Sequence, residues 1–533
     1  MKKGLIRKGF NFYKKYGFRG GIATLTGKWQ IKDSDYAAWY EKNKVTIEEL
    51  EIQRNMTFDY MPEISILVPV YNTPSEFLHD MIRSVQNQSY QRWQLCIANA
   101  NPENEEVNNI LQCYTNTDDR IQVVDVPENL GIAQNTNKAL DIAKGDYIGL
   151  LDHDDIIAPN AMFEVAKAIN EKKADVLYTN EDKITMHGEE HFQPNFKPDF
   201  NLDLLRSNNY ICHFFVAKAS LIKEIGGFRR EYNGAQDHDL IFRCTEKAKK
   251  IVKISKVLYH WRMHKQSTAE NPESKKYAFI AGKKAIEDHL KRSGEKAEVN
   301  MTEYPGFFRV KYEMEQKPEI TVVIVKDKKK MVSKEILIKL ADDYGRELVE
   351  FVIVDGTYSG DIRVDGLSIR TILWEKDNDY IDMLNCGINS ARNEYILLLS
   401  ADTKEVADHY LRELVSNAMR KDVGAVGGKI YFPNKTIKNA GFVKQEDGIM
   451  QEVFKGLPKT CIGYMNRQSL QQDMDALTLE NMMIKKNIWS KVKEKEDISK
   501  DLEIDVEIST QIRENALLLV YDPWAESVVR KER

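Results

Sequence analysis

Three carboxylates stand almost side by side in the stretch GLLDHDDIIAP, residues 149–159. Asp152, Asp154 and Asp155 directly follow a short apolar run, and His153 separates the first two. Carboxylates this close raise each other's pKa by repulsion unless a positive group lies among them. Hard divalent cations such as Mg²⁺ and Mn²⁺ prefer oxygen ligands of this kind, and Mg²⁺ usually binds substrate phosphates as well. The cluster therefore predicts a metal site for a substrate that carries phosphate.

A helix start is the competing interpretation of the same acids. Aspartates favour the first turn of a helix, because they cap free backbone N–H groups and interact well with the helix dipole. Asp155 alone fits that role. Three acids at the end of a strand exceed what a cap needs, so we favour the metal site.

An alternation of strands and helices must position these acids. Apolar, β-branched runs predict buried strands at 63–72, 93–100, 121–126 and 147–151. Helices are predicted between them, at about 75–88 and 132–143. This order predicts an α/β fold with a mostly parallel sheet flanked by helices. Ligands bind such sheets at the carboxyl ends of the strands, where the aspartates lie.

The same pattern recurs in the second half of the chain. The stretch NKALDIAKGDYIGLLDHD (137–154) is echoed by NCGINSARNEYILLLSAD (385–402), at a constant offset of 248 positions. We interpret the two copies as homologous domains in tandem. At this offset Asp152, Asp154 and Asp155 align with Ser400, Asp402 and Thr403. The metal site is therefore predicted in the first copy, and the second copy is predicted to be degenerate.

Four regions follow from this repeat. We predict a basic amphipathic helical segment at 1–58, a catalytic domain at 59–300, a polar linker at 301–317 and the degenerate domain at 318–533. Every charged residue before Asp33 is basic. Such a segment can bind an anionic membrane surface, or it can be a solvated positive face packed on its own domain.

Composition limits the function further. A net charge of −5 gives no argument for nucleic acid as a partner. No apolar stretch approaches the roughly 20 residues that a transmembrane helix needs. We expect a cytoplasmic protein, attached peripherally to the inner face of the plasma membrane if the basic segment binds lipid.

Five motifs in order resemble family-2 glycosyltransferases. They are EISILVPVYNTP, the DHDD after YIGLL, GGF at 226–228, GAQDHDL at 234–240 and VLYHWRMHKQST at 257–268. The resemblance extends to rhamnosyltransferase-like members that build bacterial surface polysaccharides. It covers residues 35–300, and more weakly 318–533. It implies GT-A (nucleotide-diphospho-sugar transferase, Rossmann-like) domains in tandem, a UDP- or dTDP-linked sugar donor, Mn²⁺ or Mg²⁺, and inversion at the anomeric carbon.

The resemblance also implies roles for individual residues. Asp237 occupies the position of the catalytic base, although an Asp there also suits a helix N-cap. The implied metal ligands are Asp152, Asp154 and His264. The implied nucleotide-sugar-binding residues are Pro69, Val70, Tyr71, Asn99, Asn101, Asn137, Asp152 and Asp155. Further contacts to the diphosphate or the acceptor are implied for Asp239, His260 and Arg262.

One position departs from the family pattern. The acid that accepts a hydrogen bond from uracil aligns with Ala100, which has no such acceptor. Asn99 or Asn101 can substitute, because an amide both donates and accepts. The donor base therefore stays open between uracil, thymine and another base.

The function that fits these observations is an inverting, metal-dependent glycosyltransferase. It would move a sugar from a nucleotide-diphosphate sugar to a glycan or polyprenyl-linked glycan acceptor in bacterial cell-surface polysaccharide synthesis. Two alternatives stay open. One is a non-catalytic scaffold that binds nucleotide sugars or glycans. The other is a nucleotidyltransferase, which would call for a glycine-rich phosphate loop that VPVYNTPSEF lacks.

Overall fold

The computed structural model describes residues 33–264, 276–326, 331–357, 360–375, 379–445, 447–492 and 501–530. The basic part of the predicted N-terminal segment, residues 1–32, lies outside the described residues, and so does the end of the motif at 257–268. None of the helices in the described parts has the length and apolar character needed to cross a lipid bilayer.

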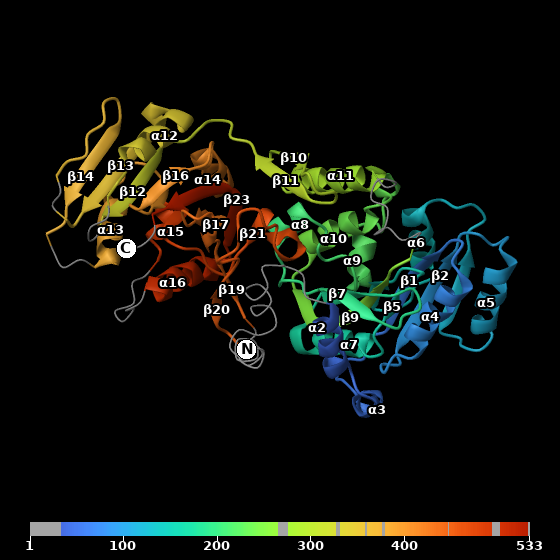
Figure 1. Ribbon diagram of the computed structural model, residues 1–533. Helices are drawn as coiled ribbons and strands as arrows, with labels where there is room; N and C mark the ends of the chain where they lie inside the picture. The colour runs from blue at the N-terminus through green and yellow to red at the C-terminus, as the bar shows by residue number, and fades with distance from the viewer. Residues whose placement is uncertain are drawn as a thin grey trace.

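A nine-stranded sheet forms the first half of the molecule (Figure 1). Its order is β3 (Ile121–Asp125), β2 (Trp93–Asn99), β1 (Ile64–Val70), β4 (Tyr147–Leu150), β8 (Phe215–Lys218), β6 (Val176–Ile184), β9 (Ile251–Arg262) and β5 (Ile156–Ile157), and β7 (His191–Asn195) pairs with β6. The first four strands are parallel, as expected, and β6 and β9 are parallel to each other. Antiparallel β8 joins these two groups.

Helices cover both faces of this sheet, because alternate side chains of a strand point to opposite faces. Ile64, Ile66 and Val68 of β1 pack in a core with α4 (Ser75–Gln86), α5 (Glu105–Thr115) and α7 (Ala161–Lys172). Leu67 faces a second core. That core is completed by α6 (Ile132–Asp141), α8 (Leu202–Ser207), α9 (Ala219–Glu224), α10 (Gln236–Lys247) and α11 (Lys276–Arg292).

Eight strands of the ten-stranded sheet in the second half repeat the order of the first sheet. Its order is β14 (Ser368–Leu373), β13 (Val349–Asp355), β12 (Ile320–Lys326), β15 (Tyr395–Leu399), β22 (Asn481–Lys485), β17 (Val423–Tyr431), β23 (Leu518–Val529) and β16 (Thr403–Val406). Each neighbouring pair has the same relative direction as its counterpart in the first sheet. The α/β class and the tandem arrangement are therefore confirmed.

The register supports the predicted alignment of the two copies. Ile64 pairs with Tyr147 in the first sheet, and Ile320 pairs with Tyr395 in the second, 248 positions after Tyr147. The turn after the strand is also shared. The N–H of Asp155 donates to the carbonyl of Asp152 at 3.3 Å, and Thr403 donates to Ser400 at 3.1 Å.

The second half has its own helices and short strands. Its helices are α12 (Lys334–Tyr344), α13 (Tyr380–Ser390), α14 (Tyr410–Ala418), α15 (Lys486–Trp489) and α16 (Asp501–Glu514), with 3₁₀ turns η3 (Arg346–Leu348) and η4 (Tyr464–Ser469). Its remaining strands are β18 (Ile437–Asn439), β19 (Phe442–Lys444), β20 (Met450–Glu452) and β21 (Gln472–Asp473). A third 3₁₀ turn, η1 (Arg230–Tyr232), belongs to the first half.

The expected linker at 301–317 needs correction. It contains β11 (Phe308–Tyr312), which pairs antiparallel with β10 (Ala297–Met301). Phe308, Val310 and Tyr312 are buried, and they join the core around α8 and α11. The alternation of apolar residues in FFRVKY is the signal of this strand, and the flanking prolines obscured it.

The two halves contact each other through a buried ion pair. Arg420 donates to both oxygens of Asp203, at 2.7 and 3.0 Å, and both side chains are almost fully buried. Gln471 also donates to Asp203, at 2.8 Å. Although burial opposes it, Arg420 and then Arg206 hold the pKa of Asp203 below its ordinary value.

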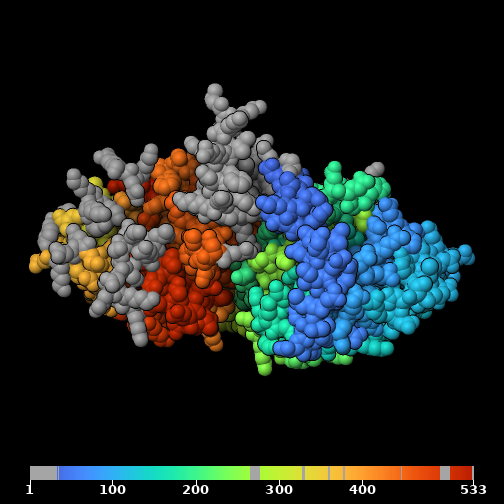
Figure 2. Space-filling view, turned by 90° about the horizontal axis from the view of Figure 1, so that it is seen from below, coloured from blue at the N-terminus to red at the C-terminus, as the bar shows by residue number. Residues whose placement is uncertain are grey.

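The predicted N-terminal helical segment includes two described helices, α2 (Asp33–Asn43) and α3 (Ile47–Asn55). Figure 2 shows them on the surface of the first half. The Tyr36 hydroxyl is buried and donates to Asp182 of β6 at 2.6 Å. Helix α3 begins with a capping box between Thr46 and Glu49.

Candidate functional site

The acidic cluster lies in the turn between β4 and β5, at the carboxyl edge of the parallel strands. Its three aspartates have different surroundings. Asp155 is fully buried and accepts from the Tyr259 hydroxyl at 2.6 Å and from the Arg262 backbone N–H at 2.8 Å. Burial, followed by the charges of the other two aspartates, raises the pKa of Asp155 well above its ordinary value. Both of its oxygens are engaged within the protein.

Asp154 is paired with a histidine from beyond the end of β9. Its Oδ2 lies 2.8 Å from the Nε2 of His264, and 18% of its side chain is exposed. Burial opposes ionisation, but His153 and the bond to His264 hold the pKa of Asp154 below its ordinary value. The predicted pair of metal ligands is therefore in contact, with Asp154 poised as a carboxylate.

Asp152 is the most open of the three, with 41% of its side chain exposed. Its Oδ2 lies 3.6 Å from the Nε2 of His213, whose ring stacks on Tyr259. The Nδ1 of His213 is buried and has no hydrogen-bond partner among the described residues. Partial removal from water raises the pKa of Asp152, His213 opposes this rise, and the neighbouring Asp154 and Asp237 add to it.

Asp237 comes to this edge from the first turn of α10. Its Oδ2 accepts from the amide of Asn209 at 2.7 Å and lies 3.7 Å from the sulfur of Cys212. Its charge contributes to the raised pKa of Asp152. Asn209 and Cys212 both belong to the loop before β8, which also carries His213.

The predicted nucleotide-binding residues follow the ends of β1 and β2. Tyr71 is exposed just after β1, whereas Val70 is buried within it. The amide of Asn101 donates to the side-chain oxygen of Asn72 at 2.6 Å. Asn99 is buried and donates to Asn108 at 2.7 Å. Pro69 is a half-buried residue of β1.

Two further predicted residues hold the Gly-Gly-Phe loop at 226–228. The side chain of Asn137 on α6 exchanges two hydrogen bonds with the backbone of Phe228, at 2.8 and 2.9 Å. A Cβ on Gly227 would lie 2.7 Å from the Oδ1 of Asn137, and its φ of +67° also favours glycine. Asp239 is fully buried and paired with Arg229 and Arg243, and Arg243 in turn donates to the carbonyl of Gly227 at 2.8 Å.

Arg262 and His260, the last two residues predicted to contact ligand, are buried in the fold. The Arg262 guanidinium donates to the carbonyls of Asp154 and Met186, at 2.8 and 2.6 Å, and to Asp80 at 3.0 Å. His260 binds the carboxylate of Asp182 at 2.6 Å. Arg262 thus fixes the acidic turn, and His260 belongs to the contact between β6 and α2.

The donor set fits a divalent cation on the evidence of this structure. Asp152, Asp155 and His213 offer ligand atoms within 4.8 Å of one another. Asp154 of the same turn contacts His264, which follows the end of β9. A mixed set of carboxylate oxygens and imidazole nitrogens suits Mn²⁺, whereas Mg²⁺ would use the carboxylates and water. Asp182, His191 and His260 form a second such group, in which both histidines already bind the carboxylate.

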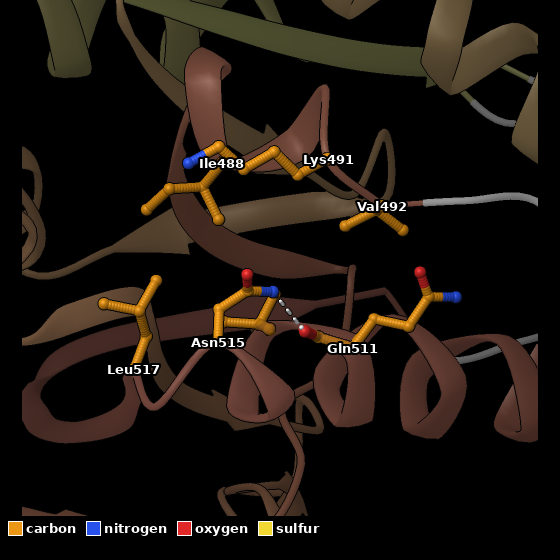
Figure 3. A pocket seen from close by; sticks show the side chains of 7 residues that line it. Ile488, Lys491, Val492, Gln511, Asn515 and Leu517 are labelled. Atoms are coloured by element: carbon orange, nitrogen blue, oxygen red, sulfur yellow. Dashed lines mark hydrogen bonds between the residues drawn. The ribbon is translucent and has the colours of Figure 1, made fainter.

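A hollow in the second half offers no alternative site for a substrate of sugar size. It lies between α15 and α16, lined by Ile488, Val492, Gln511 and Leu517 among others (Figure 3). Its volume of about 20 Å³ has room for about one water molecule.

Sequence reasoning missed three residues that shape the site. They are His213 beside Asp152, Asn209 beside Asp237, and Tyr259, which contacts both Asp152 and Asp155. The stretch NYICHFF at 209–215 carries the signal for two of them, because an asparagine and a histidine stand just before a buried strand.

Comparison with known proteins identifies the central part of the first half. The family described as Glycosyl transferase family 2 matches residues 65–226, which include the acidic turn and the loop before β8.

Two longer relatives match most of the chain. A Sinorhizobium fredii protein, y4gI, is 34% identical over 530 residues, covering 96% of this chain and 58% of the relative. The O-antigen biosynthesis protein RfbC of Myxococcus xanthus is 31% identical over 437 residues, covering 80% of this chain and 34% of the relative. This chain therefore spans less than two thirds of either relative.

A solved structure of S. aureus TarS residues 1–349, in complex with UDP-GlcNAc, is also similar. It is 19% identical, with a TM-score of 0.36, and the match covers 43% of this chain and 66% of that one.

Proposed function

We propose that this chain, a glycosyltransferase of family 2 by its residues 65–226, transfers a sugar from a nucleotide-diphosphate donor to a hydroxyl group with inversion. One observation carries the proposal. Asp154 contacts His264 at the carboxyl edge of the sheet, and Asp152 lies two residues before Asp154 on the same turn. Asp237 contacts Cys212, the neighbour of the His213 that lies beside Asp152.

The residues divide the chemistry between them. Asp152, Asp154 and His264 would hold Mn²⁺ or Mg²⁺, which when bound supplies positive charge that stabilises the departing diphosphate. Asp237 accepts the proton of the acceptor hydroxyl. The acceptor oxygen forms a bond to the anomeric carbon from the opposite face, the bond from that carbon to the diphosphate oxygen breaks, and the nucleoside diphosphate leaves with the electron pair.

The remaining predicted residues divide into two groups. Pro69, Val70, Tyr71, Asn99 and Asn101 would surround the nucleotide at the ends of β1 and β2. The others would position parts of the site. Asp155 and Arg262 hold the acidic turn. Asn137 and Asp239 hold the Gly-Gly-Phe loop, and His260 belongs to the contact with α2.

The biological setting is proposed from the sequence resemblance and one relative. RfbC of Myxococcus xanthus is named an O-antigen biosynthesis protein, which supports a role in bacterial surface polysaccharide synthesis. The acceptor would be a glycan or a polyprenyl-linked glycan at the cytoplasmic face of the membrane. The basic residues before Asp33 would favour an anionic membrane surface.

The second half is proposed to stabilise the first and to lack transfer activity of its own. It keeps the sheet but has Ser400 and Thr403 at two of the three acidic positions. Lys326 also lies 3.3 Å from Asp355 at the ends of β12 and β13, the place that corresponds to the nucleotide edge of the first half.

A donor screen tests the proposed function. Purified protein with Mn²⁺ is incubated with UDP-, dTDP- and GDP-sugars and a mixture of glycan acceptors, and release of the nucleoside diphosphate is measured. We expect release from at least one donor, lost in Asp154→Ala and retained in Asp402→Ala. Loss of release in both variants would contradict the degenerate second half.

Ala100 favours one rival, a scaffold that binds nucleotide sugars without turnover, because the acid expected there is missing. Binding of a donor without release of nucleoside diphosphate under any acceptor would support that scaffold and reject the transferase.

A further inference from the structure

The missing acid at Ala100 has a neighbour that can replace it. Asp125 is the last residue of β3, and it pairs in register with Asn99, the last residue of β2. The amide of Asn99 donates to the Oδ1 of Asp125 at 3.2 Å. Asp125 is exposed, whereas Asn99 is buried.

The side-chain amide of Asn99 has little hydrogen-bonding capacity left for a nucleotide base. Its amide nitrogen donates to both Asn108 and Asp125, and its Oδ1 accepts from the backbone N–H of Asn101 at 3.3 Å. These contacts fix the orientation of the amide and engage both of its polar atoms. Its role is to hold the Asp125 carboxylate in place rather than to read the nucleotide.

Asp125 lies at the correct edge for nucleotide recognition. The ends of β1, β2 and β3 are adjacent and parallel, so Tyr71, Asn99 and Asp125 follow one another along one edge of the sheet. Neighbouring strands are about 4.8 Å apart, which places Asp125 roughly 10 Å along the sheet from the end of β1. A base that lies beside the exposed Tyr71 ring would have its far edge between the end of β1 and Asp125.

We propose that Asp125 accepts the N3–H of a uracil or thymine base and so selects uridine- or thymidine-linked donors. This inference rests on the proposed function, because it names the donor class of that same site. Uracil and thymine carry a donor at N3, whereas the N3 of cytosine is an acceptor, which a carboxylate repels. The side chain that discriminates the base therefore comes from β3 rather than from the end of β2.

Nucleotide binding by the full chain tests this assignment. Affinities of UDP and CDP are measured by calorimetry with Mn²⁺ for the wild type, Asp125→Ala and Asp119→Ala. Asp119 is an exposed acid just before β3, at the opposite edge of the sheet, so its variant removes the same charge away from the site. Thermal unfolding verifies that each variant is folded.

We expect the wild type to bind UDP at least tenfold more tightly than CDP. Asp125→Ala should weaken UDP binding about tenfold or more, the effect of one hydrogen bond to a charged group. It should tighten CDP binding, because the repulsion between the carboxylate and the N3 of cytosine is removed. Asp119→Ala should match the wild type.

Three results would overturn the assignment while leaving the proposed function intact. These are unchanged UDP binding in Asp125→Ala, a wild-type preference for CDP or a purine nucleotide, or loss of discrimination in Asn101→Ala instead. Absence of any nucleoside diphosphate binding by the wild type would reject the proposed function itself, and this assignment with it.

Discussion

Neighbouring aspartates of one short turn take different roles because their partners differ. Asp155 is buried against Tyr259 and Arg262, Asp154 is paired with His264, and Asp152 is open to solvent. Histidines lie beside two of the three acids, His213 next to Asp152 and His264 next to Asp154. In the proposed mechanism Asp152 and Asp154 hold the metal, and Asp155 supports the turn that carries them.

A pair of variants in α10 separates catalysis from structure. Asp237→Asn keeps the shape of the side chain but cannot accept the acceptor's proton, so kcat should fall about 10²- to 10⁴-fold while donor affinity stays. Asp239→Asn should instead cost about 3–5 kcal/mol of stability, because it disrupts buried pairs with Arg229 and Arg243.

Steady-state kinetics and denaturant unfolding measure the two effects. Equal loss of stability in both variants, or full activity in Asp237→Asn, would contradict the division of roles.

The buried Lys429 of β17 should make the free energy of unfolding depend on pH. It is 4% exposed, and its ammonium group forms no hydrogen bond or ion pair with any described residue. Burial lowers the pKa of this ammonium group to about 8. The unfolded chain then binds this proton more tightly than the native one. The free energy of unfolding should therefore rise as pH increases from about 8 to 10.5, and the penalty is complete below pH 8.

Lys429→Met should remove that pH dependence and stabilise the chain at pH 7 by up to about 3 kcal/mol. Denaturant melts at pH 7 and pH 10 measure this change, with the exposed Lys421→Met as the control. A destabilised Lys429→Met at pH 7 would show that the ammonium is needed where it lies.

At the scale of elements, strand ends assemble the site. The sequence alone predicts β1 to β4, α4 and α6 closely, because apolar runs and helical periodicity leave local signals. It also places Asp154 and His264 in one predicted metal site, through the resemblance of the motifs. It does not predict the partners of Asp155, Asp239 or Arg262, because those contacts depend on how β9, α9 and α10 pack in three dimensions.

Strand β9 holds the acidic turn through a tyrosine. The Tyr259 hydroxyl donates to Asp155 and accepts from the backbone N–H of Asp152 at 3.3 Å. Tyr259→Phe should loosen the turn and weaken Mn²⁺ binding about tenfold or more, as removal of groups behind metal ligands does.

Tyr147→Phe is the matched control. Its hydroxyl is buried and donates to the carbonyl of Ala174 at 2.7 Å, at the other end of β4. Both variants should lose about 1 kcal/mol of stability, and only Tyr259→Phe should lose metal affinity. Equal Mn²⁺ affinity in the two, measured by calorimetry, would contradict the positioning role of β9.

At the scale of the whole molecule, two copies of one sheet are fixed to each other. The buried pair of Arg420 and Asp203 connects the second half to α8, the helix before the loop that carries His213. This contact is the basis for the proposed role of the second half as structural support.

Removing Arg420 should therefore affect the entire chain. Arg420→Ala leaves Asp203 buried without its main partner and should cost about 3–5 kcal/mol. Arg363, whose side chain is 85% exposed in its pair with Asp361, is the control, and its alanine variant should lose at most about 1 kcal/mol. Denaturant unfolding measures the stability of both variants. An equal loss of stability in the two would contradict the prediction.

Mn²⁺ binding is the most direct test of the central claim, that the acidic turn of the first half holds the metal. Free Mn²⁺ is titrated by electron paramagnetic resonance, with UDP present, into the wild type, Asp154→Asn and the equivalent Asp402→Asn. We predict that binding weakens at least tenfold in Asp154→Asn and stays at the wild-type value in Asp402→Asn. Unchanged binding in Asp154→Asn would contradict the account.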